Sequence, residues 1–203
     1  LEYENFTAAA AKIHIQGCNI HPGYAKDKMM NAMRIAMELD AMLPAAQRPE
    51  YTEGYEGFFH LTGINGTVEE TSMSYIIRDH DKAKFEEKKA LMTAVVDILN
   101  QKYGHLVTLE LTDQYYNMRQ QIEPHFFIVE KAMKAMEMAN IEPKVQPVRG
   151  GTDGANLSFM GLPCPNLFAG GHNFHGKYEY VPLESMMKAS EVIPNIITLF
   201  QAE

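Results

Sequence analysis

The alternation of apolar and polar residues predicts a strand and then a helix near the start of the chain. Ala11–Gln16 alternates between the two kinds of side chain, which is typical of a strand with one buried face. Lys28–Leu43 places apolar residues at helical spacing, and Pro44 would end that helix. The residues that would share its apolar face are Met29, Met33, Ala36, Met37 and Leu43.

Two more strands and a second helix follow in the sequence. Tyr55–Ile64 and Ser72–Arg78 are rich in aromatic and β-branched residues, and Asn65-Gly66 between them is a turn signal. The second helix is predicted to begin after the N-cap Asp81 and to end at Gly104. Its apolar positions are Phe85, Met92, Val95, Val96 and Leu99.

A last strand, in which Val107, Leu109 and Leu111 alternate with polar residues, completes the order βαββαβ. This order is typical of the ferredoxin-like fold, in which two helices cover one face of an antiparallel sheet and leave the other face open. On topology alone, a free-standing ferredoxin-like module of unknown role remains the simpler interpretation.

The pattern changes from about residue 118 onward. Short apolar segments at Lys144–Val148 and Asn166–Ala169 are predicted as strands between helices, which favours an α/β layer with a mostly parallel sheet. The apolar positions of the helix before them are Phe127, Val129, Ala132, Met133 and Met136. Those of the helix after them are Met186, Val192, Ile193, Ile196, Ile197 and Phe200.

Two glycine-rich segments in this second part carry candidate chemistry. In Arg149–Gly154, a cationic side chain beside a glycine turn could hold an anionic end of a substrate. In Gly170–Glu179, a histidine on a glycine-rich loop could supply a neutral imidazole to a metal ion. Together they suggest part of an active site.

With Asn19–Gly23, Tyr75–Asp79 and Phe159–Asn166, these segments resemble the peptidase T family of bacterial aminotripeptidases, within the co-catalytic dizinc aminopeptidase and carboxypeptidase group. The resemblance runs along the whole chain, but the N-terminal half of the family, which supplies the carboxylate metal ligands and the general base, has no counterpart here. We therefore expect the C-terminal half of a larger enzyme, inactive by itself.

The resemblance implies a domain division and a partner. Residues 1–116 would form a ferredoxin-like lid and dimerisation domain, with the first few residues as a connection, and residues 117–203 the C-terminal portion of the α/β catalytic domain. Members of related families pair through this lid, so a homodimer is expected. The full-length subunit would bind two zinc ions, with at most one ligand from this chain.

The resemblance also implies roles for four residues. His175, in the segment His175-Gly176-x-x-Glu179, would ligate zinc; Arg78 and Arg149 would bind the C-terminal carboxylate of a tripeptide. His21 would reach the partner's active site and stabilise the oxyanion of the tetrahedral intermediate. Without the resemblance, the histidines would be ordinary surface or core residues, and Arg78 would form a surface salt bridge with Asp79 or Asp81.

Composition narrows the remaining functional classes. The net charge of -8 argues against nucleic acid, and no apolar run has the length of a membrane span. Cys18 and Cys164 lie far apart, so a reducing cytoplasm is the expected location. The alternatives to a tripeptidase are a related dizinc dipeptidase, carboxypeptidase or deacylase, or a non-catalytic dimerisation fragment.

Overall fold

The computed structural model describes residues 1–201, which fold as two compact units. The sheet unit runs from Phe6 to Tyr116. The helical unit combines Leu1–Asn5 with the chain from Asn117 onward. The first five residues therefore belong to the same unit as the second half of the chain.

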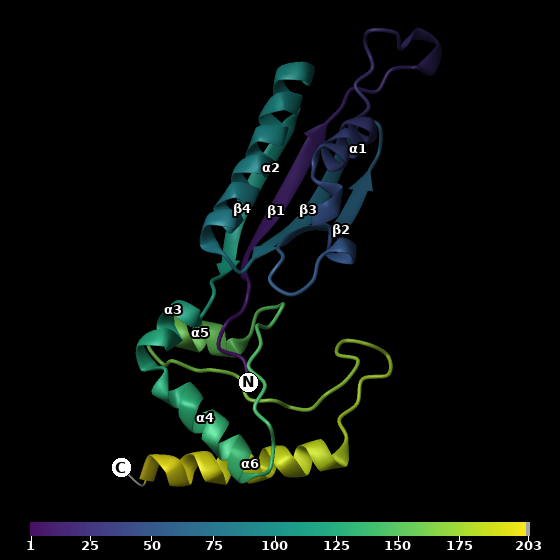
Figure 1. Ribbon diagram of the computed structural model, residues 1–203. Helices are drawn as coiled ribbons and strands as arrows, with labels where there is room; N and C mark the ends of the chain where they lie inside the picture. The colour runs from purple at the N-terminus through teal and green to yellow at the C-terminus, as the bar shows by residue number, and fades with distance from the viewer. Residues whose placement is uncertain (202–203) are drawn as a thin grey trace. The chain divides into compact units, whose positions relative to one another are not determined.

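The sheet unit is built on four antiparallel strands in the order β2-β3-β1-β4 (Figure 1). The strands are β1 (Thr7–Gln16), β2 (Phe58–Gly66), β3 (Glu70–Asp79) and β4 (Val107–Tyr115). Helices α1 (Ala32–Met42) and α2 (Lys82–Tyr103) cover one face of this sheet. The predicted ferredoxin-like βαββαβ fold is thereby confirmed.

The core of the sheet unit lies between the helices and one side of the strands. On β1, Ile13 and Ile15 are buried on the helix side, whereas Lys12 and His14 are exposed on the other side. The buried positions on the other elements include Phe59, Met73, Ile77, Ile35, Leu39, Phe85, Met92 and Leu99. At Lys12 and His14 the face away from the helices is thus exposed and polar.

Helix α2 has the boundaries that the sequence predicts. The side chain of Asp81 accepts a hydrogen bond from the Lys84 N–H at 2.9 Å, and Gly104 ends the helix at a φ of 85°. A side chain at Gly104 would be strained at this φ, so the residue type itself specifies the helix end.

Helix α1 differs from the prediction at its start and in its buried face. Met30 is held extended by a bridge to Cys18, so Asn31 becomes the N-cap and the helix begins at Ala32. The buried residues are Ala32, Ile35, Ala36 and Leu39. Two of the expected core methionines are instead exposed, Met33 by 38% and Met37 by 51%.

The turn between β2 and β3 also lies later than predicted. Asn65 and Gly66 are the last residues of β2 and pair with Ser72 and Thr71. The turn follows them because the Thr67 hydroxyl accepts hydrogen bonds from the backbone N–H groups of Glu69 (3.2 Å) and Glu70 (3.3 Å). A side-chain turn of this kind replaces the expected Asn-Gly turn.

The helical unit consists of short helices joined by extended segments. Its elements are α3 (Arg119–Ile122), a 3-10 turn (Glu123–His125), α4 (Phe127–Met138), α5 (Asp153–Phe159) and α6 (Leu183–Gln201). Helix α4 packs on α6 through a core that includes Val129, Ala132, Met136 and Val192. Of the apolar positions predicted for the last helix, Met186, Ile193, Ile197 and Phe200 are exposed.

The two strands predicted in this unit appear only as single bridges. Val148 pairs in parallel with Asn5, and Asn166 pairs antiparallel with Glu2. The Asn166 N–H donates to the Glu2 carbonyl at 2.8 Å, and the Glu2 N–H donates back at 3.0 Å. Because each segment makes one bridge and no ladder, the expected parallel sheet is not formed among residues 1–201.

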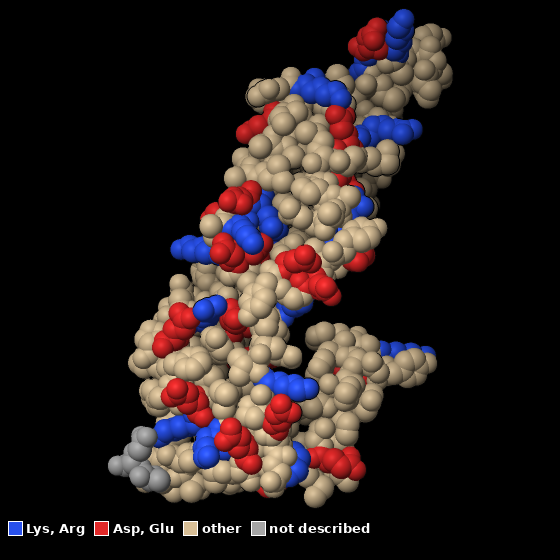
Figure 2. Space-filling view, in the orientation of Figure 1, with Lys and Arg blue, Asp and Glu red and all other residues tan. Residues whose placement is uncertain are grey.

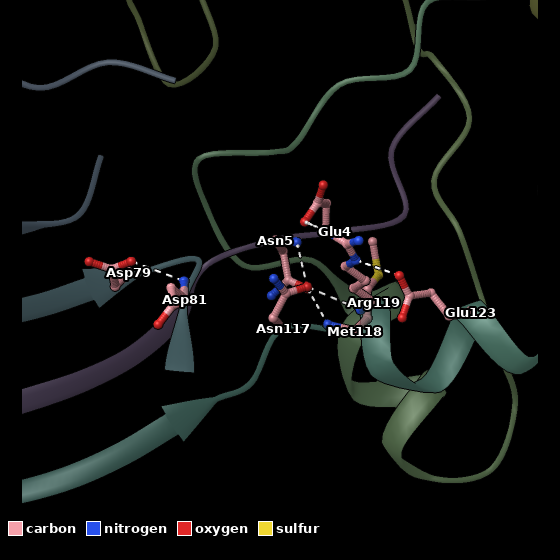
Figure 3. A network of polar contacts seen from close by, with 8 residues as sticks. All are labelled: Glu4, Asn5, Asp79, Asp81, Asn117, Met118, Arg119 and Glu123. Atoms are coloured by element: carbon pink, nitrogen blue, oxygen red, sulfur yellow. Dashed lines mark hydrogen bonds and ion pairs between the residues drawn. The ribbon is translucent and has the colours of Figure 1, made fainter. Parts of the chain in front are cut away.

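A polar network ties together the two segments through which the chain leaves and re-enters the helical unit (Figure 3). The Asn117 side-chain oxygen accepts hydrogen bonds from the N–H groups of Asn5 (3.3 Å) and Arg119 (3.0 Å). The Asn5 side-chain oxygen accepts one from the Met118 N–H at 2.8 Å. Arg119 also pairs with Glu123 at 2.6 Å. The two asparagines thus satisfy backbone groups that no helix or strand satisfies.

Basic and acidic side chains are interspersed on the visible surface of both units, with no basic stripe on this face (Figure 2). This distribution accords with a net charge of -8. No helix in the described part of the chain has the length and hydropathy to cross a membrane.

One buried phenol makes the stability of the sheet unit depend on pH. Tyr75 is 2% exposed, and its hydroxyl donates to Asp40 at 2.9 Å. Burial, followed by this hydrogen bond and the charge of Asp40, raises the pKa of Tyr75 above its ordinary value. A raised pKa means that the stabilisation is complete below the unfolded pKa of about 10 and is lost as the pH rises toward the folded value.

We therefore expect Tyr75→Phe to reduce the alkaline sensitivity of the fold. At pH 8 the variant should be less stable by about 1 kcal/mol because it lacks the hydrogen bond to Asp40. Above about pH 10 that difference should shrink, since only the wild-type chain loses stability by ionising Tyr75. Urea unfolding at several pH values measures the difference in unfolding free energy between the variant and the wild type. The control is Tyr24→Phe, because Tyr24 is exposed. A pH-independent difference would contradict the expectation.

Candidate functional site

His21 lies on a loop that projects beyond the end of β1 (Figure 1). The loop is closed at its base by the bridge between Cys18 and Met30. Gly17 is required there, because a Cβ would lie 2.5 Å from the Met30 carbonyl oxygen. His21 precedes the 3-10 turn Pro22–Tyr24 and is exposed.

The hydrogen bonding of His21 specifies which ring nitrogen can act as a donor. Its Nδ1 accepts a hydrogen bond from the Gly23 N–H at 3.1 Å, and the ring packs beside Tyr24 at 5.3 Å between centroids. A neutral imidazole that accepts at Nδ1 carries its proton on Nε2. His21 therefore presents an Nε2–H donor on an exposed loop.

Arg78 lies near the end of β3, at the opposite end of the sheet unit from the His21 loop. Its guanidinium carbon is 5.9 Å from the ring centroid of Phe58 and 6.0 Å from that of Tyr115. The Arg78 Nε is buried without a hydrogen-bond partner. The salt-bridge alternative is not observed, because Asp79 pairs with Lys88 at 2.9 Å, and Arg78 makes no ion pair within residues 1–201.

The sheet register separates His21 from Arg78 in one subunit. Ala8 of β1 pairs with Arg78, whereas Gln16, close to the His21 loop, pairs with Glu70. Eight residues of strand span roughly 27 Å. A fully extended tripeptide spans at most about 11 Å. One copy of the sheet unit therefore cannot bring both side chains to one tripeptide.

Arg149 belongs to the loop between the extended segment that ends at Val148 and helix α5. The side chain of Thr152 caps α5 by accepting from the Ala155 N–H at 3.2 Å, and Asp153 is the first helical residue. Gly154 is required because a Cβ would lie 2.5 Å from the Cys164 carbonyl oxygen. The loop that carries Arg149 is thus defined at its helical end.

His175 lies on a loop closed by paired hydrogen bonds between His172 and Tyr180, of 2.8 and 3.2 Å. Its φ is 62°, which few residues other than glycine adopt. The Glu179 carboxylate accepts a hydrogen bond from the His175 N–H at 3.0 Å, which holds this strained backbone. The segment His175-Gly176-x-x-Glu179 is therefore a structured loop with an exposed imidazole at its tip.

The described residues form no complete ligand set for a metal ion. No group of three or more His, Cys, Asp or Glu side chains comes together among residues 1–201. A zinc site requires about four ligands. The exposed imidazole of His175 therefore does not form a complete zinc site with other residues of 1–201.

Sequence reasoning missed Phe58 and Tyr115, the two aromatic residues beside Arg78. Phe58 lies within a segment predicted as a strand, but nothing in the sequence pairs it with Arg78. Tyr115 follows a predicted strand whose alternation ends at Leu111. Strand register is the only signal that could have placed either ring beside the arginine.

Comparison with known proteins identifies the family. Residues 3–107 match the family model described as peptidase dimerisation domain. A protein named peptidase T from Alkaliphilus oremlandii is 64% identical over 201 residues, which cover 98% of this chain and 49% of that protein. The chain thus spans about half the length of the curated relatives it matches.

Solved structures show the same fold. Aminopeptidase PepT from Bacillus cereus has a TM-score of 0.80 at 22% identity, over 97% of this chain and 53% of that one. A tripeptidase from Staphylococcus aureus has a TM-score of 0.87 at 17% identity, over 99% and 53%. The family model and these relatives agree: the chain belongs to the peptidase dimerisation domain family and is similar over nearly its whole length to the C-terminal half of proteins named peptidase T.

Proposed function

We propose that this chain is the C-terminal half of a dizinc aminotripeptidase that removes the N-terminal residue from tripeptides. The observation that carries the proposal is the 64% identity to a protein named peptidase T over nearly the whole chain. The Arg78 Nε, which is buried without a hydrogen-bond partner, supports it, because a guanidinium suits a peptide carboxylate.

In this proposal, each of the four candidate residues has one task. Arg78 and Arg149 bind the C-terminal carboxylate and thereby measure the length of the peptide. His175 is one ligand of the metal site. His21 donates its Nε2–H to the developing oxyanion of the scissile carbonyl.

Two zinc ions would supply an activated water near neutral pH and polarise the scissile carbonyl. The residues of this chain would orient that reaction rather than transfer its proton, since the glutamate expected as general base lies outside it. Glu179 would hold the backbone of His175 in its loop conformation through the hydrogen bond to the His175 N–H.

The active unit in this proposal is a homodimer. The separation of His21 from Arg78 supports it, because both can act on one peptide only if they come from different subunits. The order β2-β3-β1-β4 also leaves two edge strands for pairing. The two free cysteines, Cys18 and Cys164, support the reducing cytoplasm as the location.

We expect the isolated 203-residue chain to hydrolyse no tripeptide and to bind no tight pair of zinc ions. The reason is that a zinc site needs about four ligands, and the described residues bring together no such set. A zinc count and an aminopeptidase assay test this expectation when they are made on this chain and on the full-length protein in parallel. Chelator-sensitive release of the N-terminal residue by the pure chain would contradict the expectation.

A further inference from the structure

A row of four residues crosses the sheet at Arg78. Phe58 of β2 pairs with Arg78 of β3, Arg78 pairs with Ala8 of β1, and Ala8 pairs with Tyr115 of β4. Residues opposite one another in neighbouring strands point to the same face. Ala8 is small, so the side chains of Arg78 and Tyr115 can meet across it.

A β-bulge in β4 places Tyr115 on this face. Ala9 pairs with Asp113, but Ala8 pairs with Tyr115, so the register shifts by one residue between them. Without the shift, Tyr115 would share the side of Asp113, which bonds Lys89 of α2 on the helix-covered side. Bulges are common beside active sites, where they redirect a side chain.

Both partners in this contact have polar atoms without a hydrogen bond. The Arg78 Nε and the Tyr115 hydroxyl are buried, and neither has a partner within residues 1–201. Each such atom carries a free-energy cost unless a ligand or water satisfies it. Burial raises the pKa of Tyr115, which keeps the phenol protonated and able to donate, while the charge of Arg78 acts in the opposite direction.

We propose that the Tyr115 hydroxyl donates a hydrogen bond to the same substrate carboxylate that Arg78 binds, while the rings of Phe58 and Tyr115 hold the guanidinium between them. The inference rests on the proposed function. A carboxylate offers four acceptor positions, so a guanidinium fork and a phenol can bind it together. Rings on two sides also limit the rotation of the guanidinium, which lowers the entropy lost on binding.

The first test is Tyr115→Phe in the full-length protein, assayed with trialanine and with its C-terminal amide. A hydrogen bond to a charged group is worth a factor of about 10 to 100. We expect kcat/KM for trialanine to fall by that factor and the value for the amide to change less than about 2-fold. The matched control is Tyr116→Phe, because Tyr116 is exposed and its hydroxyl already bonds Asp113. Equal losses for both substrates, or none, would overturn the inference.

Arg78→Ala distinguishes failure of the inference from failure of the proposed function. If Arg78→Ala lowers kcat/KM equally for trialanine and for its amide, the proposed role of Arg78 itself is wrong. If Arg78→Ala lowers kcat/KM more for trialanine than for the amide and Tyr115→Phe does not, only the role of Tyr115 is wrong.

A second measurement needs no variant and covers the case in which Tyr115→Phe does not fold. The pKa of Tyr115 can be followed by NMR in wild-type, zinc-depleted enzyme with 13C-labelled tyrosine. A carboxylate beside the phenol disfavours phenolate, so trialanine should raise the pKa of Tyr115 and its amide should not. The same pKa with either peptide would overturn the inference.

Discussion

Replacing His21 by alanine in the full-length protein is expected to lower kcat by about 100- to 1000-fold, the usual effect of removing an oxyanion donor. The metal content should stay unchanged, because His21 lies on the loop after β1 rather than on the loop of His175. The expected effect is on kcat more than on KM, since the oxyanion forms only in the transition state.

The control for this variant is His125→Ala, which removes an exposed histidine at the end of the 3-10 turn Glu123–His125. Steady-state kinetics and a zinc count on both variants distinguish an oxyanion donor from a residue needed for metal binding. If His21→Ala loses zinc, or if its kcat equals that of His125→Ala, then His21 is not an oxyanion donor.

Removing either arginine is expected to weaken tripeptides far more than amidated peptides. The loss of a charge-assisted pair should cost about 2 to 3 kcal/mol in kcat/KM for Arg78→Ala or Arg149→Ala. A C-terminal amide carries no negative charge for the arginine to pair with, so kcat/KM for the amidated peptide should change little. The exposed Arg34→Ala is the control for general loss of a cationic side chain. Equal effects on acid and amide would show that the arginines are structural.

The sequence predicts α2 accurately because its ends are encoded locally. The Asp81 cap, the apolar spacing and Gly104 each specify the helix without help from distant residues. The sequence pattern predicts an earlier start for α1 than the structure shows, because the bridge between Cys18 and Met30 holds Met30 extended. Tertiary pairing of this kind overrides helix periodicity and is invisible to a local pattern.

The candidate site also contains residues that a local sequence pattern can predict and residues that only long-range pairing places. His175 and Glu179 could be chosen because they stand close together in a recognisable motif, and the structure connects them by a hydrogen bond. Tyr115 could not be chosen, because simple alternation continued from Leu111 would place it on the helix side of β4. Only the bulge opposite Ala8 and Ala9 moves it beside Arg78. A one-residue shift exchanges the two faces of a strand, so a sequence pattern cannot resolve it.

The sequence pattern predicts more strand in the helical unit than the structure contains, for a related reason. An apolar segment becomes a strand only when neighbours pair with it along its length. Within residues 1–201, Lys144–Val148 and Asn166 each make a single bridge, and both bridges are to the first five residues. Local propensity indicated extended backbone correctly but could not indicate how much pairing was available.

Subunit complementation tests the central claim, that His21 of one subunit serves the active site of the other. Full-length His21→Ala and His175→Ala proteins, each inactive alone, are mixed and allowed to exchange subunits, with exchange shown by labelling. In the mixed dimer one site lacks both histidines and the other lacks neither. We expect activity to return toward half of wild type per mixed dimer. A mixture that exchanges subunits and remains as inactive as its parents would contradict the claim.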